Sequence, residues 1–176
     1  MSNDIIFNRG RGGLGRALAG KDHVSGIVVE MAAAKIPAAI VSLGLYTVIY
    51  SVQDAEDLGI LYDVGEDSLQ LDSLKYAIDT AFAVNEKAII HLSIADTDAT
   101  KTLASELITM QNQADGEVRQ ALLIAAATPF AVGALAPLQA SCDVLEALHK
   151  PLSVIYAPNF VGVVVGTENI RDQDNK

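Results

Sequence analysis

Six residues near the N-terminus have the spacing of a dinucleotide-binding loop. Gly10, Gly12 and Gly15 match the pattern G-x-G-x-x-G. Glu30 follows twenty residues after Gly10, where an acid could bind a ribose. Such a loop needs a full helix after it, whose N-terminus holds the pyrophosphate. Only eight residues separate Gly15 from the strand predicted at 24–31, enough for about two turns of helix. The glycines therefore favour an extended arm, and no cofactor is expected.

Acidic residues gather in two places. Asp96 and Asp98 follow a predicted strand, at the end where α/β proteins bind ligands. Together with Thr128 and residues 157–159 they would form the site of a small-ligand or nucleotide-binding α/β enzyme, which is the alternative function for this chain. A second acidic run, over 54–72, lacks the regularly spaced oxygens of an EF-hand loop. Helix N-termini and turns explain that run, so no metal site is expected.

Three histidines and one cysteine complete the set of candidates. His23, His91 and His149 lie in unrelated places, and no pair has the spacing of metal ligands. Cys142 falls in a helical pattern and is expected to be a small core residue. The sequence contains neither G-x-S-x-G nor a P-loop. We therefore expect no catalytic residues and no enzyme activity.

Charge is unevenly distributed along the chain. Residues 1–21 carry four basic residues and one acidic residue, whereas the rest of the chain carries eight basic and 21 acidic residues. The net charge of −10 argues against nucleic-acid binding, which needs a basic face. A basic end on an acidic body suits copies that dock head to tail. We expect Arg9, Arg11 and Arg16 to make these intersubunit contacts.

The elements that must position these groups follow an α/β pattern. The stretch QALLIAAAT at 120–128 is apolar, ends before Pro129, and is predicted to be a central parallel strand buried on both faces. Other strands are predicted at 24–31, 88–95 and 151–158. The apolar segments 38–45 and 46–52 are predicted to form one strand, or two strands around Gly44. Helices are predicted at 51–59, 68–85, 100–113 and 131–150, the last delayed or kinked by Pro137.

These elements predict a single three-layer α/β domain with a mostly parallel central sheet flanked by helices. Its predicted divisions are a basic, Gly-rich N-terminal arm at 1–22, the α/β domain at 23–166 and a disordered polar tail at 167–176. Two uncharged stretches, 36–53 and 120–142, are interrupted by proline and glycine. They are therefore predicted not to span a membrane.

The order of these motifs resembles that of contractile phage tail sheath proteins. The chain is similar to the prophage-encoded, sheath-like proteins of otherwise unassigned role, over residues 23–160. The motifs that carry the resemblance are SGIVVE (25–30), VIYSVQDAEDLGI (48–60), AFAVN (81–85), AIIHLSIAD (88–96), ALLIAAATP (121–129) and LSVIYAPN (152–159).

The resemblance implies a structural subunit that self-assembles through extended arms and charged surfaces. Strand addition needs no catalytic residue, and a head-to-tail contact that does not close produces helical filaments. The implied partners are copies of the chain and a tail tube protein, without nucleic acid or a membrane. The implied location is the bacterial cytoplasm during assembly and then the virion tail. A further alternative is an adaptor that binds another protein through the acidic helix near Asp54–Asp57.

Overall fold

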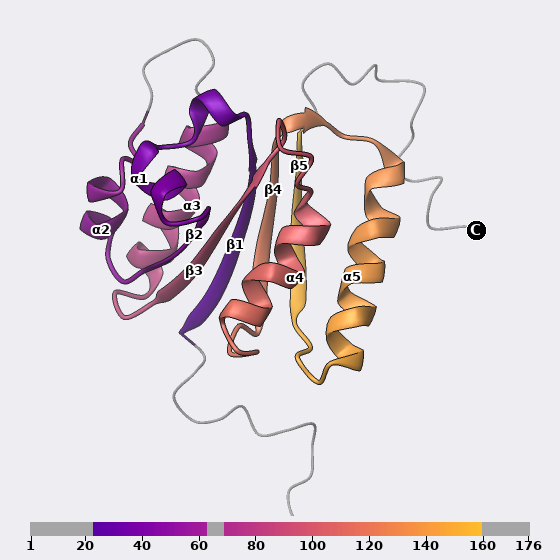
Figure 1. Ribbon diagram of the computed structural model, residues 1–176. Coiled ribbons are helices and arrows are strands. Elements are labelled where there is room, and N and C mark those ends of the chain that lie inside the picture. The colour runs from indigo at the N-terminus through magenta and orange to yellow at the C-terminus, as the bar shows by residue number, and fades with distance from the viewer. Residues whose placement is uncertain (1–22, 63–68, 160–176) are drawn as a thin grey trace, which may run out of the picture.

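The structure is a computed structural model that describes residues 23–62 and 69–159 (Figure 1). Its strands are β1 (Val24–Met31), β2 (Tyr46–Ile49), β3 (Ile89–Asp96), β4 (Gln120–Pro129) and β5 (Ser153–Asn159). Its α-helices are α1 (Ala38–Ser42), α2 (Val52–Asp57), α3 (Leu69–Val84), α4 (Leu103–Gln113) and α5 (Leu135–Ala147). Two 3-10 turns, η1 (Ala33–Lys35) and η2 (Val132–Ala134), complete the list.

The five strands form one sheet in the order β2-β3-β1-β4-β5. The four strands β3, β1, β4 and β5 run parallel, and the short edge strand β2 pairs antiparallel with β3. The connection that follows β1 contains α3 and crosses one face of the sheet, whereas the connection that follows β4 contains α5 and crosses the other face. This is the doubly wound arrangement. The predicted α/β class with a mostly parallel sheet is confirmed.

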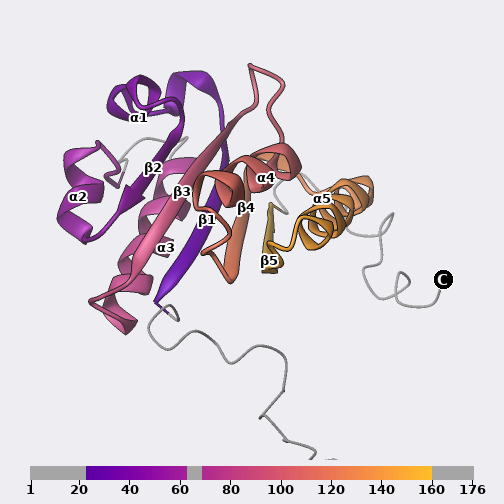
Figure 2. The ribbon, with the colours of Figure 1, turned by 60° about the horizontal axis from the view of Figure 1, so that its bottom comes forward.

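Helices cover both faces of the sheet, as the predicted three layers require. Figure 1 shows α1, α2 and α3 on one side and α4 and α5 on the other, and Figure 2 shows the same separation from another direction. Side chains alternate along each strand, so the core has two parts. On β1, Ile27 and Val29 pack in the cluster with α3, whereas Val28 packs in the cluster with α4 and α5.

The predicted helices are found, and local chemistry explains where they begin. Ser51 caps α2, because its hydroxyl oxygen accepts a hydrogen bond of 3.1 Å from the Asp54 amide. Thr102 caps α4 in a reciprocal arrangement with Ser105. At the last helix, η2 precedes α5, and Pro137 lies in the first turn of α5, where its missing amide costs little.

The strand predicted at 38–45 is wrong, because this segment contains the helix α1. Pro37 stands at the N-cap of this helix, and Ile40 is its buried residue. Gly44 and Leu45 then take positive φ angles of 79° and 68°, which turn the chain into β2. The β-branched composition favoured a strand, but the chain has to reverse direction between β1 and the antiparallel β2. The following prediction, a strand within 46–52, is confirmed by β2.

The stretch QALLIAAAT is an interior parallel strand, as predicted, and it differs from the prediction only in lying beside the central strand and in its burial at some positions. β1 occupies the centre of the sheet, and β4 lies next to it. The face of β4 toward α4 and α5 is buried at Ala121, Leu123 and Ala125. On the other face Ile124 and Ala126 are buried in the cluster with α3, and Leu122 is half-buried. The predicted burial on both faces is therefore found over 123–126, and it is incomplete at Leu122, which borders an open groove.

Candidate functional site

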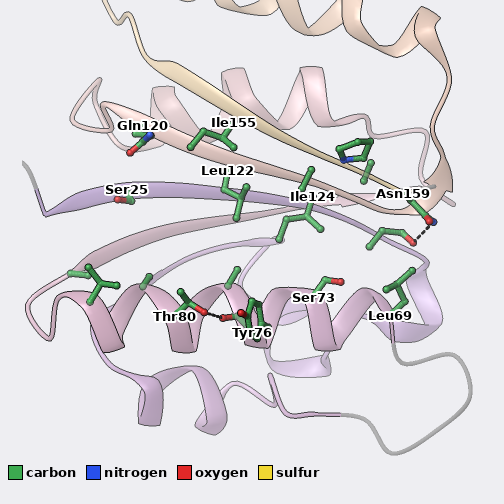
Figure 3. A pocket seen from close by; sticks show the side chains of 18 of the residues that line it. Ser25, Leu69, Ser73, Tyr76, Thr80, Gln120, Leu122, Ile124, Ile155 and Asn159 are labelled. Atoms are coloured by element: carbon green, nitrogen blue, oxygen red, sulfur yellow. Dashed lines mark hydrogen bonds between the residues drawn. The ribbon is translucent and has the colours of Figure 1, made fainter. Parts of the chain in front are cut away.

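A groove lies between α3 and the face of β4 and β5 that is turned toward this helix. Its volume is about 1340 Å³. Leu69 and Asn159 lie at its end beside the carboxyl ends of the strands, and His23 and Gln120 lie at the opposite end. Figure 3 shows residues of α3 on one side and residues of β1, β4 and β5 on the other. The groove therefore follows the full length of the neighbouring strands.

The lining of this groove is mainly apolar and carries no formal charge of a lysine, arginine, aspartate or glutamate among the described residues. Its polar groups are hydroxyls, amides and the imidazole of His23. The lining consists of His23, Ser25, Leu69, Ser73, Tyr76, Ala77, Thr80, Ala81, Val84, Asn85, Ala88, Gln120, Leu122, Ile124, Ala125, Ala126, Ile155, Ala157, Pro158 and Asn159. Such a surface fits an apolar, uncharged occupant better than a charged one.

The groove is open because α3 does not extend over β5. Leu74, Ile78 and Phe82 of α3 point into the core. The side of the helix that faces the groove leaves Tyr76 67% exposed, and Ile155 of β5 across from it is 50% exposed. Large apolar side chains gathered at this exposure mark a binding surface more often than a solvated one.

The edge of the sheet runs beside the groove. β5 pairs with β4 on one side, and among the described residues no strand pairs with its other side. An unpaired strand edge presents amide and carbonyl groups that an added strand can bond. An extended polypeptide could therefore bond to β5 with its backbone and place alternate side chains in the groove.

The predicted ligand-site residues at the carboxyl ends of the strands are engaged within the protein. The Asp96 carboxylate accepts a hydrogen bond of 3.0 Å from the Asp98 amide, and the Asp98 carboxylate accepts one of 3.1 Å from the Ala33 amide. Asn159 Nδ2 donates a bond of 3.2 Å to the Ala126 carbonyl. These contacts are those of turns and strand ends, and they do not gather the side chains around one ligand atom.

Glu30 is a residue of this edge that the sequence suggested only as part of the nucleotide pattern. It lies at the carboxyl end of β1, on the same face as Val28, and bonds to Thr128. Its Oε2 atom is buried without a hydrogen-bond partner. Burial raises the pKa of the Glu30 carboxyl, and the bonds from Thr128 oppose that rise. Apart from that pattern, the sequence signals this residue only as an acidic side chain at the end of an apolar strand.

The acidic run around α2 and α3 holds the two helices together. Lys75 is buried, and its Nζ lies 3.2 Å from Glu56 Oε1 and 2.5 Å from Asp79 Oδ1. Tyr62 donates a hydrogen bond of 2.9 Å to Asp79. In the part of the chain that the structure describes, no group of three or more His, Cys, Asp or Glu residues could hold a metal ion.

The histidines and the cysteine occupy separate places. His91 lies in β3 on the face toward α4, and a hydrogen bond of 2.7 Å joins its Nδ1 to the Tyr46 hydroxyl. Burial lowers the pKa of the His91 imidazole, against a smaller opposite effect of the Glu117 charge. Cys142 of α5 packs against the core beneath that helix, and burial raises the pKa of its thiol.

Several predicted residues lie outside the described part of the chain. They are Arg9, Arg11 and Arg16, expected to contact other subunits, and the glycine pattern of Gly10 to Gly15. The arm at 1–22 and the tail at 167–176 lie outside it as well.

Within the described ranges, the fold and the groove define a doubly wound α/β domain with an apolar flank on β5 that no described helix covers. Comparisons with protein-family models, curated proteins and solved structures found no match. The resemblance to tail sheath proteins therefore stays a prediction. Across residues 23–62 and 69–159, no helix has both the length and the apolar character that crossing a bilayer requires.

Proposed function

We propose that the protein is a structural subunit of a contractile phage tail sheath or a sheath-like injection apparatus, and that it assembles with copies of itself. The observation that carries this proposal is the groove between α3 and the β4–β5 face. In the proposal, an extended segment of a neighbouring copy binds there. Its backbone bonds to the free edge of β5, and its apolar side chains fill the groove.

The size and chemistry of the groove favour a polypeptide over a small molecule. Small-molecule sites usually enclose about 300–1,000 Å³ and contain a few polar groups that converge on the ligand. This groove is larger, at about 1340 Å³, and its polar groups are spread along its length. A strand of five to seven residues is about 17–23 Å long, which suits a groove that follows neighbouring strands.

The charge distribution supports assembly between copies. The groove and edge of one subunit receive a segment from a different part of the next, so the contact is heterologous and leaves a free site at each end of the chain of subunits. Arg9, Arg11 and Arg16 would then pair with the acidic body of a neighbour, since the 155 residues that follow residue 21 carry eight basic and 21 acidic residues. A tail tube protein is a further proposed partner.

Replacing Ile155 by aspartate tests the groove as the site of assembly. Ile155 is 50% exposed on β5, so Ile155→Asp should leave the core intact while placing a charge in the apolar groove. We expect the concentration for half-maximal self-association to rise at least about tenfold, which corresponds to about 1.4 kcal/mol. Sedimentation velocity over a concentration series measures this shift, and thermal unfolding checks that the variant is folded.

Leu148→Asp is the matched control, because Leu148 is 51% exposed just beyond the end of α5 and does not line the groove. Its association should equal that of the unchanged chain. Equal weakening by both variants would show that charge alone disrupts association. A chain that stays monomeric at every concentration would contradict the proposed function itself.

Deleting residues 1–21 tests the part of the proposal that concerns Arg9, Arg11 and Arg16. The deletion removes a net charge of +3 and is expected to leave thermal unfolding unchanged while weakening self-association. The weakening should be largest at low salt, because screening already reduces charge pairing at high salt. A shortened chain that is unfolded by circular dichroism would instead place these residues within the fold.

A further inference from the structure

We propose that the segment that bonds to the free edge of β5 is strand β2 of a neighbouring copy, so that one sheet continues from subunit to subunit. The inference rests on the proposed function, and it names the occupant of that assembly site. The sheet ends at β2 on one side and at β5 on the other. Within the described ranges, no further strand pairs with either edge.

The free edge of β5 presents the backbone groups of alternate residues. The Ser153 amide donates a hydrogen bond of 2.9 Å to the Arg119 carbonyl, so the backbone groups of Ser153 are directed toward β4. Successive residues of a strand alternate in this direction. The amide and carbonyl groups of Val154 and Tyr156 are therefore directed outward. Pro158, which has no amide hydrogen, also falls at an outward position, where a proline is tolerated.

The free edge of β2 presents a matching pair of residues. The Ile94 amide of β3 donates a hydrogen bond of 2.9 Å to the carbonyl of Leu45, which directly precedes β2. Alternation then directs the backbone groups of Thr47 toward β3 as well. Those of Tyr46 and Val48 are directed outward. Each edge of the sheet thus offers two residues, two positions apart, whose amide and carbonyl groups can bond to a further strand.

Strand direction and side-chain faces agree with pairing of these two edges. Within one copy β2 runs opposite to the four parallel strands, so copies in the same orientation would bring β2 and β5 together antiparallel. Val48 would then lie opposite Val154, and Tyr46 opposite Tyr156, and each pair would exchange two hydrogen bonds. Opposite residues share a face of the sheet. Tyr46, Val154 and Tyr156 all pack in the cluster with α4 and α5, so both faces continue across the contact.

The helical layers are offset in the way that this contact requires. Figure 1 and Figure 2 both show α2 beyond β2 at one end of the sheet and α5 beyond β5 at the other end. On the side of α3, the neighbour's α2 would approach the groove. The chain on either side of α2 exposes Tyr50 by 60% and Leu61 by 50%, which are apolar side chains that suit the lining of the groove.

Charge favours the antiparallel direction as well. In this direction the carboxyl end of β2, with α2 after it, lies beside the amino end of β5. Asp54 and Asp57 belong to α2, and Lys150 precedes β5. The contact therefore brings acidic side chains of one copy to a basic side chain of the next. A parallel arrangement would place the same acids beside the uncharged Asn159.

A disulfide between copies tests this register. Thr47 and Ile155 would lie opposite each other between the two bonded pairs, where the strands approach within the reach of a disulfide. Chains that carry Cys142→Ser with either Thr47→Cys or Ile155→Cys are mixed at a concentration at which the protein associates, oxidised, and mapped by mass spectrometry. The expected product joins position 47 of one chain to position 155 of another. In the control, Gln113→Cys, exposed at the end of α4, replaces Ile155→Cys and should crosslink to Thr47→Cys at least about tenfold less.

Val48→Lys gives a second measurement, because it changes the β2 edge and leaves the groove intact. Val48 is half-buried, so a lysine there can reach solvent in the isolated subunit. We expect the concentration for half-maximal association to rise at least about tenfold, while thermal unfolding shows that the variant is folded. Gln113→Lys is the matched control and should associate like the unchanged chain. Unchanged association of Val48→Lys would overturn the inference.

The crosslinks also separate this inference from the proposed function. A product that joins two copies of Ile155→Cys would show symmetric pairing of two β5 edges and would overturn the inference, as would a yield equal to that of the control. If Ile155→Asp weakens association and no disulfide joins positions 47 and 155, the proposed function stands and β2 is not the occupant. A chain that stays monomeric at every concentration contradicts both.

Discussion

The two faces of the sheet are built in contrasting ways. On the face toward α4 and α5, Val28 and Leu123 are completely buried and the strands are covered as far as Val154 and Tyr156 of β5. On the other face α3 packs over the interior strands but leaves Ile155 of β5 half exposed. One strand, β5, thus has a covered side and an open side. The difference separates the part of the fold that gives stability from the part that is free to bind.

Polar contacts join the elements of the covered face to one another. Gln111 of α4 is completely buried, and its Nε2 donates hydrogen bonds of 2.9 Å to the Val118 carbonyl and 3.0 Å to the Lys150 carbonyl. The Ser141 hydroxyl of α5 donates a bond of 3.0 Å to the Ala104 carbonyl of α4. These bonds fix α4 and α5 to each other and to the loops that lead into β4 and β5. The open groove has no such set of crossing contacts among the described residues.

Close packing distinguishes the covered face as well. Met110 of α4 lies directly over Gly26 of β1, so a Cβ added at Gly26 would lie 2.5 Å from the Met110 Cε atom. Only glycine lets the helix approach the strand so closely. No helix of the described chain lies over the opposite face of β5 in this way. The two faces therefore differ in how tightly they are filled, and not only in how exposed they are.

Two adjacent leucines on β4 give the most direct test of the difference in packing between the two faces. Leu123 is completely buried on the covered face, and Leu122 borders the groove. Leu123→Ala should reduce the free energy of unfolding by about 2–5 kcal/mol, because it removes buried methyl groups and leaves a cavity. Leu122→Ala should cost about half as much or less, because its site is already half open. Urea unfolding of both variants measures the difference.

The two substitutions remove the same atoms from the same strand, so each is the control for the other. Equal losses would mean that the groove side is packed as tightly as the covered side. That result would remove the main reason to regard the groove as a binding surface.

Much of the fold was predictable because the elements carry local signals. Leu74, Ile78 and Phe82 recur at helical spacing and predict α3. The strands β1, β3 and β4 are apolar runs that end at turn residues. The segment 38–45 failed because composition cannot reveal that Ile40 anchors a helical turn between β1 and β2. At β4, four of its residues are alanines, so no alternation could show which side stays open.

The groove as a whole could not be predicted from the sequence, although residues 157–159 of the predicted ligand site do line it. It exists because β5 lies at the edge and α3 falls short of it, and both facts depend on the order of strands in the sheet. That order is set by contacts between residues far apart in the chain, such as Ile27 with Leu92 and with Leu122. The sequence did mark Asp96 and Asp98 as candidates. Aspartates in such a pattern are typical of turns, which depend only on neighbouring residues and can therefore be recognised in the sequence.

Glu30 allows a finer comparison, since its carboxyl is partly buried on the covered face and its Oε2 atom has no hydrogen-bond partner there. Burial raises its folded-state pKa above the ordinary value of 4.5. Between pH 4.5 and the raised folded-state pKa, the Glu30 carboxyl is ionised in the unfolded chain and still protonated in the folded chain. The contribution of the protonated carboxyl to stability is therefore complete below 4.5 and is lost as pH rises through the folded-state pKa. Glu30→Gln should remove this dependence.

We expect Glu30→Gln to match the unchanged chain in urea unfolding at about pH 3.5, where both side chains are neutral, and to exceed it in stability at pH 7. The gain should be smaller than the loss from Leu122→Ala, because solvent reaches part of this carboxyl and weakens the effect. Glu86→Gln, an exposed change after α3, controls for the loss of one negative charge. A Gln variant that is less stable at pH 7 would mean that the bonds from Thr128 to the carboxylate outweigh the cost of burying it. The covered face would then include a stabilising charged contact at the edge where β1 and β4 diverge.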